Sequence, residues 1–107
     1  MESSHGEPES NADQDLLIMA GQIAERCCAE VMRRLSGLWP DMSAAEARSY
    51  IRTRSAVVVQ RETQRWVIDH RDMRLPESVK LIETATELLV EHFLSVHASS
   101  ADERHAA

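Results

Sequence analysis

The feature that most constrains the fold is a long helical pattern that begins at Ser43. The sequence SAAE from Ser43 to Glu46 fits a capping box, in which the serine oxygen accepts a hydrogen bond from the amide three residues on and the glutamate reaches back to the serine amide. No glycine or proline follows before Pro76. The pattern can therefore continue for about 30 residues, or ~45 Å. We predict a helix over residues 43–73, and the rest of the chain must supply partners for it.

One further helix is predicted on each side of this pattern. Between residues 13 and 36 apolar side chains recur at helical spacing, and Gly37 and Pro40 then stop the pattern. Pro76 suits the first position of another helix over residues 76–97, in which apolar residues keep a three-then-four spacing. Because the connections are short, we predict an all-α fold, a three-helix up-down-up bundle with a long central helix.

The ends of the chain differ from this helical part. Residues 1–12 and 98–107 contain almost no large apolar residue, so we predict a disordered acidic N-terminal tail and a short disordered polar C-terminal tail. The remaining single helical domain, residues 13–97, has a small core. Such a core gives marginal stability unless association buries more surface, which raises the expectation of self-association.

The charge is placed unevenly along the 107 residues, whose net charge is −6. Residues 1–25 hold six acids and no Lys or Arg, residues 26–75 hold ten arginines against six acids, and residues 76–107 hold six acids against Lys80 and Arg104. A basic middle is thus flanked by acidic ends. This pattern disfavours nucleic acid as a partner, because such proteins seldom surround their basic element with negative charge.

The sequence shows no targeting or membrane signal. No basic-then-apolar leader is visible, and no apolar run approaches the roughly 20 residues of a membrane span. Cys27 and Cys28 are adjacent, so they form neither a loop-closing disulfide framework nor a CxxC metal site. We expect a cytoplasmic protein without membrane association, with Cys27 in the core and Cys28 nearer the edge of its helix, where an intermolecular disulfide stays open.

The helix over residues 43–73 carries two groups of apolar side chains. The main face consists of Ala44, Ala47, Ile51, Val58, Val59, Trp66 and Met73. A narrower group, Tyr50, Val57 and Ile68, lies about 120° away on the helical wheel, and the helix over residues 76–97 shows a similar surplus at Leu81 and Leu88. We predict that these five residues form a homodimer or other protein interface. The alternative is that they are scattered surface apolars.

Three arginines, Arg54, Arg61 and Arg65, run between the two apolar groups. Like charges four residues apart repel, so a negative partner is expected. Three sources stay open: an acidic ladder on the helix over residues 76–97, of the same subunit or of a second one, the phosphates of a nucleic acid, or a small anion or acidic partner. The ladder consists of Glu83, Glu87 and Glu91. We favour internal neutralisation or solvated arginines over the other two.

Enzymatic chemistry has weak support. Glu62 lies near the middle of the main apolar face, where burial would raise its pKa unless an arginine pairs with it. We favour a polar group at the edge of the bundle, or a buried ion pair, over an acid or base catalyst. The histidines show no metal-binding spacing, and we predict no catalytic residues, no cofactor and no metal site.

These patterns favour a non-enzymatic, self-associating small helical protein with an interaction, regulatory or adaptor role, and a homodimer as its first partner. One alternative is a nucleic-acid-binding protein that uses the arginine face of the central helix. A second is a small helical enzyme that acts on an anionic substrate, with Glu62 as acid or base.

Overall fold

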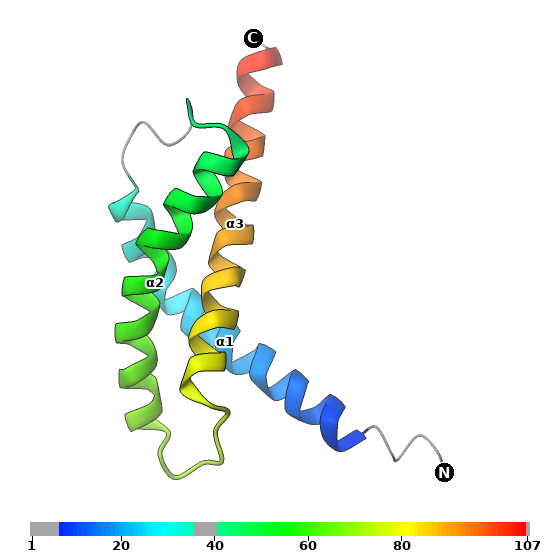
Figure 1. Ribbon diagram of the computed structural model, residues 1–107, viewed down its shortest axis with the longest axis vertical. Coiled ribbons are helices and arrows are strands. Elements are labelled where there is room, and N and C mark those ends of the chain that lie inside the picture. The colour runs from blue at the N-terminus through cyan, green and yellow to red at the C-terminus, as the bar shows by residue number, and fades with distance from the viewer. Residues whose placement is uncertain (1–6, 36–40, 107) are drawn as a thin grey trace.

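The computed structural model describes the backbone of residues 7–35 and 41–106 and the side chains of residues 13–35 and 41–99. Its helices are α1 (Glu7–Arg34), α2 (Ala44–Asp69) and α3 (Ser78–Ala106). The all-α fold is confirmed, since the described residues contain no strand. Figure 1 shows α2 and α3 side by side and running in opposite directions, while α1 crosses behind them obliquely. The helical bundle therefore has one inclined member.

The start of α2 matches the predicted capping box. The Ser43 hydroxyl accepts a hydrogen bond from the Glu46 amide at 3.2 Å, and the Ser43 amide donates to Glu46 Oε1 at 2.9 Å. The carboxylate is stabilised by this amide, which holds the pKa of Glu46 below its usual value. The local sequence thus fixes where the helix begins.

The end of α2 comes earlier than residue 73. The amide of His70 donates to the carbonyl oxygens of Trp66 and Val67, and His70 Nδ1 lies 2.8 Å from the Trp66 oxygen. The imidazole also stacks on the Trp66 ring, with 4.0 Å between ring centroids. The bond from His70 to Val67 spans only three residues, so the last turn tightens and the helix ends there. With 26 residues, α2 is slightly shorter than α1 with 28 and α3 with 29, so the predicted long central helix is not confirmed.

The other helix ends also differ from the predicted bounds. α1 begins at Glu7, so Pro8 lies in its first turn, where a missing amide costs no helical hydrogen bond. α3 begins at Ser78 and continues to Ala106, through most of the predicted C-terminal tail. Alanine, glutamate and arginine favour helix there, and no glycine or proline interrupts them. Residues 1–6, within the predicted N-terminal tail, lie outside the described residues.

The core lies where the three helices meet. Ile23, Val31, Ile51, Trp66 and Phe93 are among its most completely buried side chains. Four buried polar atoms have no hydrogen-bond partner within the described part of the chain: Ser55 Oγ, Thr63 Oγ1, Trp66 Nε1 and Thr86 Oγ1. Among the described residues, no helix has the apolar length needed to cross a membrane.

Candidate functional site

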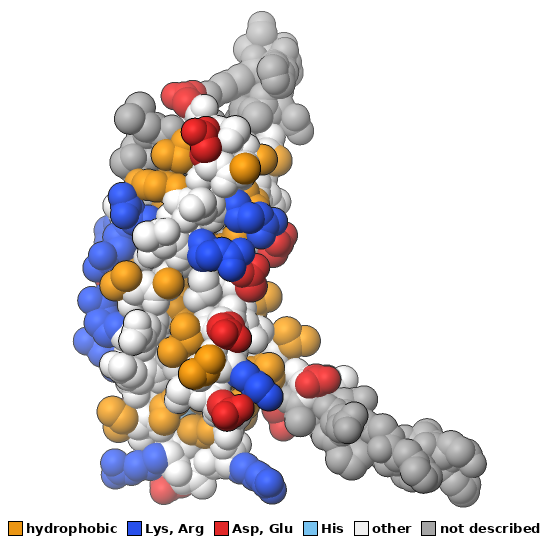
Figure 2. All heavy atoms as spheres, viewed as in Figure 1, with side chains coloured by type: hydrophobic (Ala, Val, Ile, Leu, Met, Phe, Trp, Pro, Cys, Tyr) orange, Lys and Arg blue, Asp and Glu red, His pale blue; other side chains and the backbone are white. Residues whose placement is uncertain are grey.

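The side of α2 that points away from the core carries no charge between its second turn and its end. We call this surface the outer face of α2; it consists of Ser49, Thr53, Val57, Gln60, Gln64 and Ile68, all of them exposed. Val57 is 57% exposed and Ile68 is 61% exposed. Figure 2 shows the corresponding pale and orange band over α2, with Lys and Arg side chains along its left edge and mixed charges to its right.

The predicted interface residues are divided by the structure. Val57 and Ile68 lie on the outer face, and Tyr50 lies beside it, half-buried against the core. Leu81 is 0% exposed, so its assignment to an interface was wrong; it packs in the core of the same molecule. Leu88 is 37% exposed. It belongs to α3 and is therefore not part of the outer face of α2.

Two hollows accompany the outer face, one on it and one beside it. The first, of about 400 Å³, is lined by residues that include Ser49, Tyr50, Thr53 and Arg54. The second, of about 440 Å³, lies between α2 and α3 and is lined by Arg52, Ala56, Ile82, Glu83, Thr86 and Glu87. We call the second hollow the α2–α3 groove. The outer face, which we also call the ridge, is therefore hollowed near Ser49 and Thr53 and bordered on its α3 side by the α2–α3 groove.

The arginines on the α1 side of the ridge have different partners. Arg61 donates a hydrogen bond to Glu30 of α1, which also accepts from Arg34 at 2.9 Å. The Arg61 guanidinium, followed by that of Arg34, holds the pKa of Glu30 below its usual range. Arg54 lies over the Tyr50 ring, 4.6 Å from its centroid. Arg65 has no ion pair within the described part of the chain.

The acidic ladder is neutralised by other arginines than the predicted ones. Arg48 contacts Glu91 at 3.3 Å and Glu87 at 4.0 Å, and Arg52 also contacts Glu87. These two arginines lie on the side of α2 that faces α3, whereas Arg61 faces α1. Glu83 has no ion pair with any described residue. Internal neutralisation occurs, but among the described residues of one chain none of Arg54, Arg61 and Arg65 pairs with the ladder.

Glu62 lies at the contact between α1 and α2 rather than in a cavity. Its side chain is 21% exposed, and Oε2 lies 3.5 Å from Arg26 Nη1 of α1. This agrees with the favoured expectation of an ion pair at the edge of the bundle. Nearby, burial raises the pKa of the Cys27 thiol to about 12, with smaller contributions from the charges of Glu62 and Glu30. The thiol therefore stays protonated at neutral pH, which removes its nucleophilic form.

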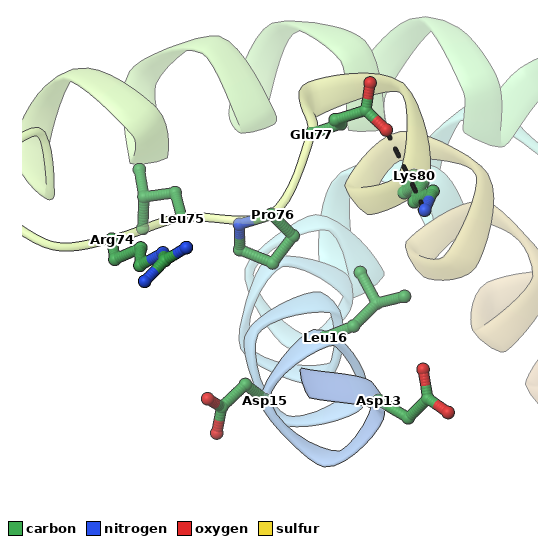
Figure 3. Close-up of a pocket in the computed structure, with 8 residues that line it drawn as sticks. All are labelled: Asp13, Asp15, Leu16, Arg74, Leu75, Pro76, Glu77 and Lys80. Carbon is green, nitrogen blue, oxygen red and sulfur yellow. Dashed lines mark ion pairs between the residues drawn. The ribbon is translucent and has the colours of Figure 1, made fainter. Parts of the chain in front are cut away.

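A further hollow of about 320 Å³ lies at the end of the molecule where the α2–α3 connection meets α1. Figure 3 shows Leu16, Leu75 and Pro76 at its centre, with Asp15 and Arg74 on one side and Glu77 paired with Lys80 on the other. Charges of both signs surround it. Within the described ranges, no group of three or more His, Cys, Asp or Glu side chains could hold a metal ion.

Sequence reasoning identified Val57 and Ile68 but missed the polar residues between them. The signal was present, since positions 49, 53, 57, 60, 64 and 68 follow the four-and-three spacing of a helix contact. Serine, threonine and glutamine do not register as apolar, so the pattern was hidden. What defines this surface is the absence of charge more than the presence of hydrophobic side chains.

No protein-family model, no curated protein and no solved structure matches this chain. The structural features left for a functional proposal are the outer face of α2 and the two hollows beside and on it. Both hollows are open depressions of the surface rather than enclosed pockets.

Proposed function

We propose that this protein is a non-enzymatic, self-associating helical module, and that a second copy packs on the outer face of α2. The observation that carries the proposal is the uncharged ridge between Ser49 and Ile68. Charged side chains make up 28% of the sequence, yet none occupies the outward positions of this stretch. Depletion of charge is the compositional mark of the centre of a protein interface.

The chemistry of the ridge fits a contact between two helices. Val57 and Ile68 supply exposed apolar area near the middle and at one end, and burying each removes it from water. The glutamine, serine and threonine side chains between them can hydrogen-bond across a contact without the desolvation cost of a charge. Since the outer face is one side of one helix, a second copy offers the same surface in return, as an isologous contact requires.

The expected dimer is weak. The ridge spans nineteen residue steps, so it is about 29 Å long. A single helix pair of that length falls at the low end of specific interfaces, which bury about 1,200 Å² or more in total. We therefore expect a dissociation constant in the micromolar range, or about −8 kcal/mol. Such an affinity suits an adaptor whose state of association follows its concentration.

The contacts of the charged residues favour this function over the two alternatives. A nucleic acid using the arginine face would have to displace glutamates from Arg48, Arg52 and Arg61. An enzyme using Glu62 would have to release it from Arg26. The outer face of α2 needs no such rearrangement, because its residues are already exposed.

Sedimentation equilibrium of the full chain across a concentration series tests the proposal. We expect a monomer–dimer equilibrium that Val57→Arg and Ile68→Arg each weaken at least tenfold, because twofold symmetry places the new charge in the contact twice. Ile18→Arg is the matched control. Ile18 is exposed to a similar degree on α1, and its replacement should leave the equilibrium unchanged. A protein that stays monomeric at about 100 μM, far above a micromolar dissociation constant, would overturn the proposal, as would a Val57→Arg variant that dimerises like the wild type.

A further inference from the structure

We propose that the two copies pack with their α2 helices parallel, so that Arg54 of each copy enters the α2–α3 groove of the other and pairs with Glu83. This inference rests on the proposed self-association and specifies its geometry. It also supplies a partner for a carboxylate that has no ion pair among the described residues.

The two flanks of the outer face carry opposite charge. On the α1 side, Arg54, Arg61 and Arg65 form ion pairs with a single carboxylate among the described residues, that of Glu30. On the α3 side, Arg48 and Arg52 are outnumbered by the three glutamates of the ladder. The first flank is therefore net positive and the second is net negative.

Symmetry decides which flanks meet. In an antiparallel pair the twofold axis is perpendicular to both helices, so each flank meets its own copy, and both contacts are repulsive. In a parallel pair the axis runs along the helices, and the positive flank of each copy meets the negative flank of the other. Charge complementarity of this kind fixes orientation at protein contacts. The distribution of charge on one chain thus selects the parallel arrangement.

The ion pairs between α2 and α3 show which residue of α2 lies level with Glu83 along the helix axis. Arg48 contacts Glu91, and Arg52 contacts Glu87, so a step of four residues along α2 matches a step of four backwards along α3. One further step places Glu83 beside Ala56, and both residues line the α2–α3 groove. In a parallel twofold pair each residue lies level with its own copy. Arg54 is two residues from Ala56, which is about 3 Å along the axis.

The position of the Arg54 side chain suits a contact with Glu83 of a second copy. Its guanidinium lies over the Tyr50 ring at 4.6 Å, which restrains the side chain on the flank of the ridge while its hydrogen-bond donors stay exposed. The groove already contains Arg52 and Glu87 as a pair, so Glu83 leaves it with one uncompensated negative charge. One arginine from a second copy cancels that charge.

Charge reversal tests the pairing in the full chain. Arg54→Glu and Glu83→Arg should each raise the dimer dissociation constant about tenfold, or about 1.4 kcal/mol, because each breaks two symmetric pairs and adds repulsion. The double variant, Arg54→Glu with Glu83→Arg, restores opposite charges and should return the constant to near its wild-type value. Arg33→Glu, which reverses an exposed arginine of α1, is the control and should change nothing.

Cross-linking tests the orientation independently. In a Cys28→Ala background, Thr53→Cys and Gln64→Cys should each form a disulfide with their own copy on mild oxidation, because a parallel pair sets like positions level. An antiparallel pair cannot self-link at both positions, and a mixture of the two variants would then give the mixed disulfide. A mixed disulfide, or a double charge variant no tighter than the single ones, overturns the parallel arrangement. If Val57→Arg still weakens that dimer, the proposed function stands without it, whereas a monomeric wild type removes both.

Discussion

The inner and outer faces of α2 belong to the same helix and have opposite consequences. The inner face is almost completely removed from water, with Ile51, Val59 and Trp66 buried against α1 and α3. The outer face is exposed along its whole length, and only its lack of charge distinguishes it from an ordinary solvated surface. Burial of the inner face stabilises the fold of one chain, whereas burial of the outer face requires a second chain. Substitutions on the two faces should therefore separate folding from association.

The largest effect is expected from Trp66→Ala on the inner face. Trp66 is 1% exposed and is the largest fully buried side chain among the described residues, so its removal leaves a cavity and should lower the free energy of unfolding by about 3–5 kcal/mol. Ile68→Ala, two residues away on the outer face, should change it by less than about 0.5 kcal/mol in the monomer. Denaturant titration of both variants measures the contrast. Equal losses would mean that the two faces are not distinct.

Two adjacent cysteines extend the comparison to α1. Cys27 is buried with a thiol pKa raised to about 12, while Cys28 is half-buried. At pH 7 a neutral maleimide should modify Cys28 more than about 100-fold faster than Cys27, since the thiolate is the nucleophile and Cys27 holds its proton. Mass spectrometry of the digested protein gives both rates. In denaturant the difference should vanish, and similar rates in the folded protein would contradict the assignment of Cys27 to the core.

Two threonines of α2 allow a buried hydroxyl group to be compared with an exposed one. Thr63 is buried and its hydroxyl has no partner, whereas the exposed Thr53 donates to the Ser49 carbonyl at 3.0 Å. Thr63→Val keeps the shape and removes an unsatisfied group, so it should raise the free energy of unfolding by about 1 kcal/mol. Thr53→Val removes a satisfied bond at the surface and should leave stability unchanged or slightly lower. A destabilised Thr63→Val variant would indicate that its hydroxyl has a partner in solution.

The inner face could be predicted from sequence because apolar periodicity records burial directly. Ala47, Ile51, Val58, Val59 and Trp66 were all assigned to the main apolar face, and all are buried. The capping box at Ser43 was equally visible, since it depends on residues close in sequence. Local rules therefore located the helix and its buried side.

The placement of Leu81 and of the ion pairs could not be predicted in the same way. Leu81 was assigned to an interface, but it is 0% exposed and belongs to the core where the three helices meet. The choice between Arg52 and Arg61 as partner of Glu87 depends on how the helices are rotated about their axes. Helical spacing fixes rotation only within one helix. Contacts between helices need the three-dimensional arrangement.

The smallest expected effect is on the pH dependence of stability, and it comes from the ion pair between Arg61 and Glu30 beside the outer face. The Arg61 guanidinium lowers the pKa of Glu30 from its ordinary value of 4.5, so this carboxylate contributes stability above that pH and loses the contribution as the pH falls through its folded pKa. Glu30→Gln should therefore flatten the fall in monomer stability on acidification below about pH 5, measured by denaturant titration at each pH.

Arg61→Gln should flatten that fall to a similar extent, although Arg34 still holds part of the shift, and the double variant should add little because both changes remove the same interaction. The slope that remains includes Glu46, whose pKa is lowered by the Ser43 amide. If Glu30→Gln left the pH dependence of stability unchanged, Arg61 would not be paired with Glu30 in the monomer. The positive flank would then carry more charge into the contact with a second copy, and the preference for parallel packing would be stronger.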